Sequence, residues 1–391
     1  MFSGNMYRNP FSDYNANTMN SEQIMDFWES PFEKYLPDIT EEEIATERTA
    51  ITFTGGRGTG KTMLLKHFSV FSQNVRAERR GVSLKQYIQE VGYVGIYIRF
   101  DTPLLQSFDG SGVSQEGWSI IFTHFFELMI CKQFLSALIL LAEKHVLSEE
   151  EKRKVVINMA ELLQREENTS LEKLSKHIIR EINYVNEYKG EAVFSETSFH
   201  PAKLYPFGSL MHPLTKIIVE NCEVLKTVNF LVLLDEYENF LTHEQRIVNS
   251  AIKFSQNIAF RVGMRPTGFH TYDTVSQDEF IKEHRDYRNV VFENPMIGKN
   301  HSGYFEFLRG IAKKRLSSVP LFYDKGMVEL EAFLGKQECP EEEAIRIVKG
   351  RNIHITEYLK EIKNAYKKAK SWHKNADAMK RQLCYTDIVE N

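Results

Sequence analysis

Five short apolar runs along the chain have the composition of buried β-strands. The third run is apolar almost throughout and ends in acids, which is typical of a central strand in a parallel sheet. The last two are stopped by Pro266 and Pro295. The runs are 50–54 (AITFT), 92–101 (GYVGIYIRFD), 229–235 (NFLVLLD), 258–266 (IAFRVGMRP) and 289–295 (NVVFENP).

Helical periodicity fills most of the chain between these runs. It predicts helices over 60–73, through most of 115–188, over about 208–226 and over 243–257, and a short helix ending near Arg285 to Arg288. Ser148 with Glu151, and Thr169 with Glu172, fit capping boxes that restart helices. Strands alternating with helices predict an α/β fold with a parallel sheet.

Four regions follow from this pattern. Residues 1–45 form an N-terminal arm, and 46–295 form the α/β core, in which 105–228 is a largely helical insertion. Residues 296–356 form a helical lid, and 357–391 form a basic C-terminal helix.

Composition and the first residues of the sequence bear on where the protein is located in the cell. The chain has 391 residues, a net charge of −4 and four widely spaced cysteines without zinc or redox spacing. The first residues lack a basic region followed by an apolar run, so we expect no signal peptide. The apolar stretch near 120–147 contains Glu127, Lys132 and Glu143, which favours a core helix over a membrane span. These features predict a cytoplasmic protein.

The segment GGRGTGKT matches the phosphate-binding P-loop pattern between a strand and a helix. Successive backbone N–H groups in such a turn form an anion nest, and the helix N-terminus adds its positive end. The alternative is a glycine-rich hairpin turn. The predicted nucleotide contacts are Gly55, Gly56, Arg57, Gly58, Thr59, Gly60, Lys61, Thr62 and Met63, with Lys61 on the β and γ phosphates and Thr62 on Mg²⁺.

The base is assigned by elimination. The guanine-reading element Asn/Thr-Lys-x-Asp is absent from the sequence, and so is the transporter-type SGGQ signature. ATP with Mg²⁺ is therefore the predicted ligand.

The run LLDE resembles a Walker B strand. Parallel strands deliver their carboxyl ends to one sheet edge, where ligands bind. Asp235 would hold Mg²⁺, and Glu236 would polarise the attacking water. The alternative is an acidic N-cap for the next helix. Glu238 is expected to be a surface or supporting acid.

Three arginines are candidates for reading the phosphates. Arg265 ends a strand where a γ-phosphate sensor would lie, although it could be an exposed arginine before a turn. Arg288 is preferred over Arg285 as a finger that reaches a neighbouring subunit's site, which can be worth about 10³–10⁵ in rate. The alternative is a solvated charged loop. Arg261 is expected to point away.

The order of these motifs resembles an AAA+ ATPase, of the three-layer P-loop (ASCE) type. GGRGTGKTMLLKHFS, LLDEYENFLTHEQRIVNSAIK and RVGMRPTGF are similar to bacterial origin-recognition-like and signal-transduction (STAND-type) ATPases, which often occur near phage-defence genes. The resemblance implies a helical lid with a second sensor, for which Arg351 is the candidate against a plain helix-start arginine. It also implies self-assembly.

Two departures weaken a role in DNA-origin binding. Only about 35 residues follow the lid, too few for a winged-helix domain, and Arg265 replaces the usual polar sensor. The basic stretch 358–383, with Tyr366 and Trp372 interleaved, could contact nucleic acid or an acidic partner, or could be a solvated helix face.

Three functions stay open. The first is an oligomeric ATPase that gates or remodels a partner protein, possibly docked on the helical insertion, in bacterial antiphage defence. The second is a nucleotide-locked scaffold with negligible turnover. The third is a DNA-associated, loader-type ATPase. None of the three calls for a membrane.

Overall fold

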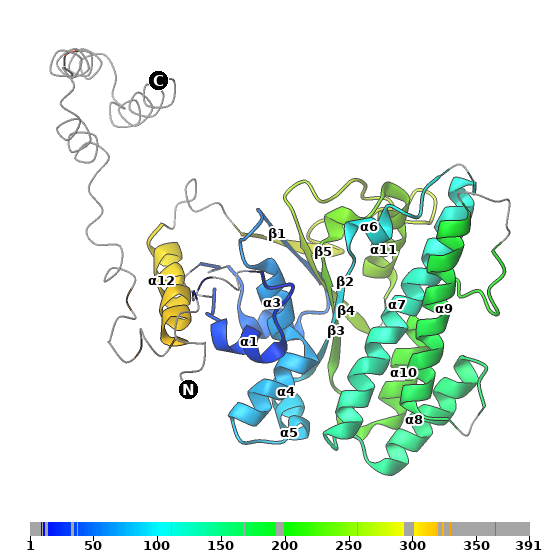
Figure 1. Ribbon diagram of the computed structural model, residues 1–391, viewed down its shortest axis with the longest axis horizontal. Helices are drawn as coiled ribbons and strands as arrows, with labels where there is room; N and C mark the ends of the chain where they lie inside the picture. Colours follow the sequence, from blue (N-terminus) through cyan, green and yellow to red (C-terminus); the bar gives the residue numbers. More distant parts are fainter. Residues whose placement is uncertain are drawn as a thin grey trace, which may run out of the picture. The chain divides into compact units, whose positions relative to one another are not determined.

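The computed structural model contains a five-stranded parallel sheet with the strand order β2-β3-β4-β1-β5 (Figure 1). All four strand pairings are parallel, so the predicted α/β class is confirmed. One strand, β4, lies between β1 and β3. The strands are β1 (Ala50–Gly55), β2 (Tyr93–Arg99), β3 (Asn229–Asp235), β4 (Ile258–Met264) and β5 (Tyr287–Phe292).

The structure describes residues 15–319 apart from 33, 34, 37, 111, 167–168, 193–198, 256 and 293–300, together with residues 9, 11, 323, 329 and 364. The chain divides into two compact units, 1–329 and 330–391. Most of the predicted lid and nearly all of the predicted basic helix lie outside the described residues, so the four-region division stays a prediction.

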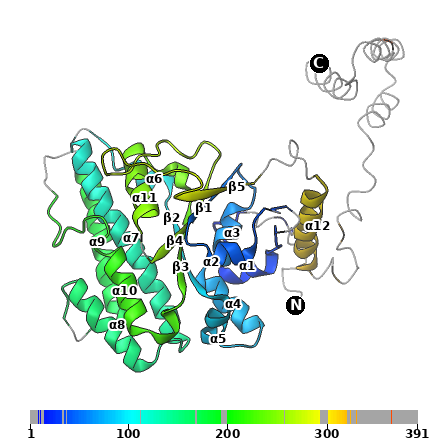
Figure 2. The ribbon, with the colours of Figure 1, turned by 180° about the vertical axis from the view of Figure 1, so that it is seen from behind.

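Helices cover both faces of the sheet, which gives the three predicted layers (Figures 1 and 2). One side carries α1 (Ser21–Phe27), α2 (Glu41–Thr46), α3 (Lys61–Phe68), α4 (Val70–Arg79) and α5 (Leu84–Val91). The other side carries α7 (Gln115–Glu143), α8 (Glu149–Leu162), α9 (Leu171–Glu191), α10 (Met211–Asn221) and α11 (Thr242–Phe254). The remaining elements of the described residues are α6 (Thr102–Leu105), η1 (Glu223–Leu225), η2 (Tyr237–Asn239) and α12 (His301–Ser317).

The alternation of side chains along β3 explains why two apolar layers form. Leu231 and Leu233 belong to the apolar cluster that includes α3, and Phe230, Val232 and Leu234 belong to the one that includes α7. Successive side chains of a strand point to opposite faces, so a strand that is apolar at each position from Phe230 to Leu234 must be covered on both sides.

Helix α7 is the central element of the insertion. It packs against α9, α10, α11 and β2. It is the one helix among the described residues that is long and apolar enough to cross a membrane, and 67% of its most apolar window is buried. Its carboxylate Glu127 accepts backbone N–H bonds from Gly208, Leu210 and Met211 at 2.7–2.9 Å and so caps the amino end of α10. These contacts are those of a core helix.

Three local predictions need correction. The helix predicted over 60–73 is two helices, because Ser69 is extended and its hydroxyl caps α4. The second capping box is wrong, since Ser170 and not Thr169 caps α9. No helix forms in the described segment before β5, where turns and isolated bridges occupy 273–286. The capping box of Ser148 with Glu151 is confirmed.

Candidate active site

The glycine-rich turn connects β1 to α3. Gly58 and Gly60 have φ values of 82° and 100°, in the left-handed region that glycine adopts without a steric penalty. Lys61 is the first residue of α3, and its ammonium donates to the carbonyls of Gly55 at 2.7 Å and Gly56 at 2.8 Å. The Lys61 side chain therefore folds back over its own loop, at the place where phosphates would bind.

Asp235 ends β3 and is almost fully buried. Tyr97 donates its phenol hydrogen to Oδ2 at 2.9 Å, and the Glu236 N–H donates to Oδ1 at 3.0 Å. Burial raises the pKa of Asp235, and hydrogen bonds from Thr62 and Tyr97 oppose that rise. The carboxylate is thus held in a defined orientation beside the first turn of α3.

Gly263 of β4 lies between the two motifs. A β-carbon added there would lie 3.0 Å from Asp235 Oδ1, 2.9 Å from Leu65 Cδ1 and 3.8 Å from Lys61 Cβ. The absence of a side chain at Gly263 therefore lets α3 and the end of β3 approach one another across β4. The P-loop lysine and the aspartate consequently line the same space at the carboxyl edge of the sheet.

Glu236 follows in a left-handed conformation, with φ 59° and ψ 44°, which is uncommon for a residue with a side chain. Its Oε1 lies 3.2 Å from Arg99 Nη2, and its Oε2 accepts a hydrogen bond from Asn239 at 2.9 Å. Arg99 also pairs with Asp101 at 2.8 Å. Each carboxylate oxygen of Glu236 therefore has one protein donor.

Arg265 and Glu238 form a pair at the same edge. Arg265 Nε lies 3.0 Å from Glu238 Oε1, and more than half of the arginine side chain is exposed. Burial lowers the pKa of Lys61, the charge of Arg265 lowers it further, and the carboxylates of Glu238, Asp235 and Glu236 oppose this. Glu238, expected to be a supporting acid, is thus the partner of the candidate sensor.

The other arginines lie elsewhere. Arg288 is near the amino end of β5, where it pairs with Glu43 at 3.0 Å and Glu47 at 3.5 Å. It is therefore far along the strand from this chain's own P-loop, and its role towards a neighbouring subunit stays a prediction. Arg261 is buried and donates to the carbonyls of Ile44 and Thr49, pointing away as expected.

Three more residues were predicted to contact the nucleotide: Arg57, Met63 and Arg351. Arg57 is exposed in the glycine-rich turn, and Met63 is half-buried in the first turn of α3. Arg351 lies outside the described residues.

Four residues near the site have no counterpart in the predicted set: Tyr97, Arg99, Asn239 and Lys66. Arg99 is in register with Asp235 across the β2–β3 pairing, and Tyr97 is two residues earlier. The rule that parallel strands end at one sheet edge could have identified Arg99, had β2 been predicted as the neighbour of β3. Lys66 is one helical turn beyond Thr62, where the P-loop pattern has already ended.

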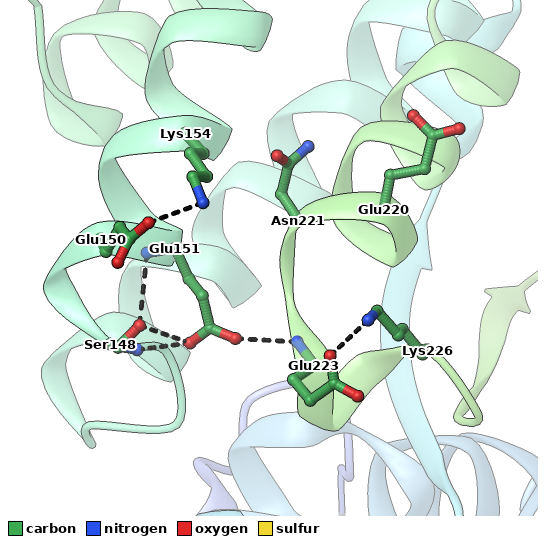
Figure 3. Close-up of a pocket in the computed structure, with 8 residues that line it drawn as sticks. All are labelled: Ser148, Glu150, Glu151, Lys154, Glu220, Asn221, Glu223 and Lys226. Carbon is green, nitrogen blue, oxygen red and sulfur yellow. Dashed lines mark hydrogen bonds and ion pairs between the residues drawn. The ribbon is translucent and has the colours of Figure 1, made fainter.

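A polar pocket of about 390 Å³ lies elsewhere, between the start of α8 and the end of α10 (Figure 3). Its groups already bond to one another: Glu151 accepts from the N–H groups of Ser148 at 2.7 Å and Glu223 at 2.8 Å, and Lys154 pairs with Glu150 at 2.7 Å. Since η1 leads into the amino end of β3, the pocket is at the sheet edge opposite to the P-loop.

The donor set around Asp235 fits a magnesium nucleotide. A carboxylate and a hydroxyl, from Asp235 and Thr62, are hard oxygen ligands, and Mg²⁺ in such sites takes its other ligands from phosphates and water. Among the described residues, no group of three or more His, Cys, Asp or Glu side chains could hold a metal ion by itself. The geometry therefore suits a metal that arrives with phosphates.

Comparison with known proteins supplies one match. A family model described as ORC-CDC6-like matches residues 9–386, which is most of the chain. No curated protein and no solved structure gives a significant match.

Proposed function

Because the chain belongs to the ORC-CDC6-like family of AAA+ ATPases, we propose that it binds Mg·ATP at the P-loop and hydrolyses it with Glu236. The observation that carries this proposal is the approach of Lys61 and Asp235 around Gly263. An ammonium and a metal-binding carboxylate on two sides of one space are what a β–γ phosphate pair requires.

The residues would divide the work as follows. The turn 55–60 cradles the phosphates with its N–H groups, and Lys61 leaves its loop carbonyls to contact the β and γ oxygens. Thr62 and Asp235 hold Mg²⁺, which when bound neutralises phosphate charge. Glu236 orients and polarises the attacking water. Arg265 reads the γ-phosphate from the same edge, and Arg351 is proposed to do so from the lid.

We further propose that the chain assembles with itself in the cytoplasm and gates or remodels a protein partner, in bacterial antiphage defence. Arg288 would then complete a neighbour's site, and an isolated subunit would turn over slowly. The helical insertion and the basic C-terminal helix are the proposed partner surfaces. A DNA-associated loader is the third candidate, and salt-dependent nucleic-acid binding would favour it.

One observation favours the nucleotide-locked scaffold as the second candidate. Glu236 is bonded through both oxygens, to Arg99 and to Asn239. An attacking water must take a remaining acceptor site on this carboxylate or displace one of the two donors before Glu236 can act as a base. A chain that kept this arrangement with nucleotide bound would hold ATP and turn it over negligibly.

Two substitutions test the catalytic assignment. We expect Glu236→Gln to bind ATP with the affinity of the unmodified chain and to lose phosphate release, because the amide cannot polarise water. We expect Lys61→Ala to lose binding, because the phosphates lose their main cation. Calorimetry measures ATP binding, and steady-state assays of phosphate release measure hydrolysis.

The outcomes separate the candidates. Hydrolysis by Glu236→Gln at the unmodified rate would show that Glu236 is not the base. Tight binding without phosphate release by the unmodified chain, at high protein concentration, would favour the scaffold.

A further inference from the structure

The Asp235 carboxylate is held from the side of β2 by Tyr97. The phenol hydrogen bond to Oδ2 is 2.9 Å long. Burial, with the negative charge of Asp235, raises the pKa of Tyr97 well above its ordinary value, so the phenol stays protonated and acts as a donor. Partners of this kind fix the orientation of metal ligands, and their removal costs about 10–100-fold in metal affinity.

Lys66 lies over the face of the Tyr97 ring. Its ammonium is 5.6 Å from the ring centroid, and the α3 helix that carries it also carries Thr62. Cation and ring attract at this separation. The lysine therefore contacts the aromatic face of the residue whose hydroxyl holds Asp235.

The three donors of the Lys66 ammonium are all used by the N-terminal arm. They reach the carbonyls of Ala16 at 2.8 Å, Asn17 at 2.9 Å and Met19 at 3.0 Å. An ammonium has three N–H donors. We call residues 15–19 the arm anchor. Helix α1 begins directly after it, with Asn20 as the capping residue.

We propose that Tyr97 and Lys66 are positioning residues for the magnesium ion, and that they couple the metal site to the arm anchor. The contacts run from the backbone carbonyls of 15–19 to Lys66, from Lys66 to the Tyr97 ring, and from the Tyr97 hydroxyl to Asp235. The inference rests on the proposed function in one respect, that Asp235 is the metal's carboxylate.

Coupling of this kind has a reciprocal consequence. If binding of Mg²⁺ with nucleotide favours the docked arm by some factor, the docked arm favours binding of Mg²⁺ with nucleotide by the same factor. Binding of a ligand at the carboxyl ends of the strands would therefore stabilise the docked N-terminal arm.

The first experiment titrates Mg²⁺ against a fluorescent ATP analogue bound to the full chain. We expect Tyr97→Phe to bind the analogue in EDTA within about twofold of the unmodified chain, and to need about 10–100-fold more Mg²⁺ for half-saturation. The matched control is Tyr93→Phe. Tyr93 lies on the same strand and the same face, but its hydroxyl accepts from Arg76 at 2.8 Å, so its Mg²⁺ titration should not move.

The outcomes are separable. An unchanged Mg²⁺ titration for Tyr97→Phe overturns the positioning role, and so does an equal loss of affinity with EDTA and with Mg²⁺, which marks a packing role only. Absence of any analogue binding by the unmodified chain would instead refute the proposed function. Should Tyr97→Phe fail to fold, Lys66→Met must raise the Mg²⁺ requirement for the inference to stand.

The second experiment measures hydrogen exchange of 15–27 with and without Mg²⁺ and ATP. We expect added Mg²⁺ and ATP to slow exchange in the unmodified chain, and Lys66→Met to abolish that slowing, because the arm then lacks its link to Tyr97. Lys85→Met, at an exposed position on α5, should retain it. Exchange in the unmodified chain that does not respond to the added ligands overturns the coupling.

Discussion

His67 is a buried imidazole between the arm and α4. Its ring stacks on Trp28 with centroids 3.7 Å apart, and Nε2 lies 3.0 Å from both Glu41 Oε1 and Arg76 Nη1. Burial and the positive charges of Arg76 and Lys314 lower the pKa of His67 to about 4, against the opposing effect of Glu41. The native protein therefore keeps this histidine neutral between about pH 6.5 and pH 4, where a free histidine is mostly protonated.

This histidine predicts a pH dependence of stability. Between pH 6.5 and 4 the unfolded chain binds a proton that the native chain does not, so stability falls as the pH falls. We expect the free energy of unfolding to drop by about 2 kcal/mol more between pH 7 and pH 5 in the unmodified chain than in His67→Gln. Urea titrations at the two pH values measure the difference. His200→Gln, at an exposed site, should follow the unmodified chain, and a His67→Gln slope like it would contradict the prediction.

The predictability of site residues follows from how they are encoded. Lys61 and Thr62 belong to one contiguous pattern, and Asp235 ends one apolar run, so local sequence identifies them. No local sequence pattern identifies Tyr97 and Lys66. Their positions matter because β2 lies beside β3 and because the N-terminal arm docks on α3. Arg288 shows the converse. Its sequence context resembles that of an arginine finger that reaches a neighbouring subunit's site, and only the fold reveals its pairing with Glu43.

At the scale of elements, β2 and α3 meet at unusually close range. A β-carbon on Gly95 of β2 would lie 1.9 Å from the Phe68 carbonyl oxygen at the end of α3. The helical pattern continues past Phe68 in the sequence, yet α3 ends there and α4 starts after Ser69. Apolar periodicity predicted helical structure over this segment, but it could not show where α3 ends and α4 begins. That boundary depends on the cap formed by Ser69 and on the close approach of Gly95, which is distant in the sequence.

Gly95→Ala should destabilise the fold. The two nearest atoms are backbone atoms of Phe68 and not part of a flexible side chain, so α3 or β2 must shift, and overpacking of this kind costs about 1–3 kcal/mol or more. Thermal melting and urea titration measure the loss. The matched control is Gly190→Ala in α9, where a β-carbon would meet no described atom within 4 Å. We expect that variant to be neutral or more stable by up to about 1 kcal/mol. Equal stability of the two variants would show that the close approach does not form.

At the scale of the whole molecule, the sheet order explains why motifs far apart in the chain meet. With β4 between β1 and β3, the P-loop and Asp235 approach across one glycine-containing strand. The alternation of strands and helices was enough to predict the parallel sheet. The order of its strands was not, because each pairing joins segments separated by tens to hundreds of residues.

Self-assembly is the whole-molecule property that the proposed function requires. We expect mass photometry to show larger species with ATP and Mg²⁺ than with ADP or without nucleotide, because Arg288 would contribute to a neighbour's γ-phosphate site. Lys61→Ala should stay in the smaller form under all three conditions. A single mass for the unmodified chain, whatever the nucleotide, would contradict assembly driven by ATP.

The Arg261 contacts bear on how the chain is made. This guanidinium bonds to a carbonyl 217 positions earlier, and within the described part of the chain β1 pairs with the last two strands, β4 and β5. At about 5–20 residues per second, translation needs roughly 10–50 s to produce those partners. During that interval the strand ahead of the phosphate loop emerges from the ribosome with both edges unpaired, so chaperone capture of the nascent chain is expected at that stage.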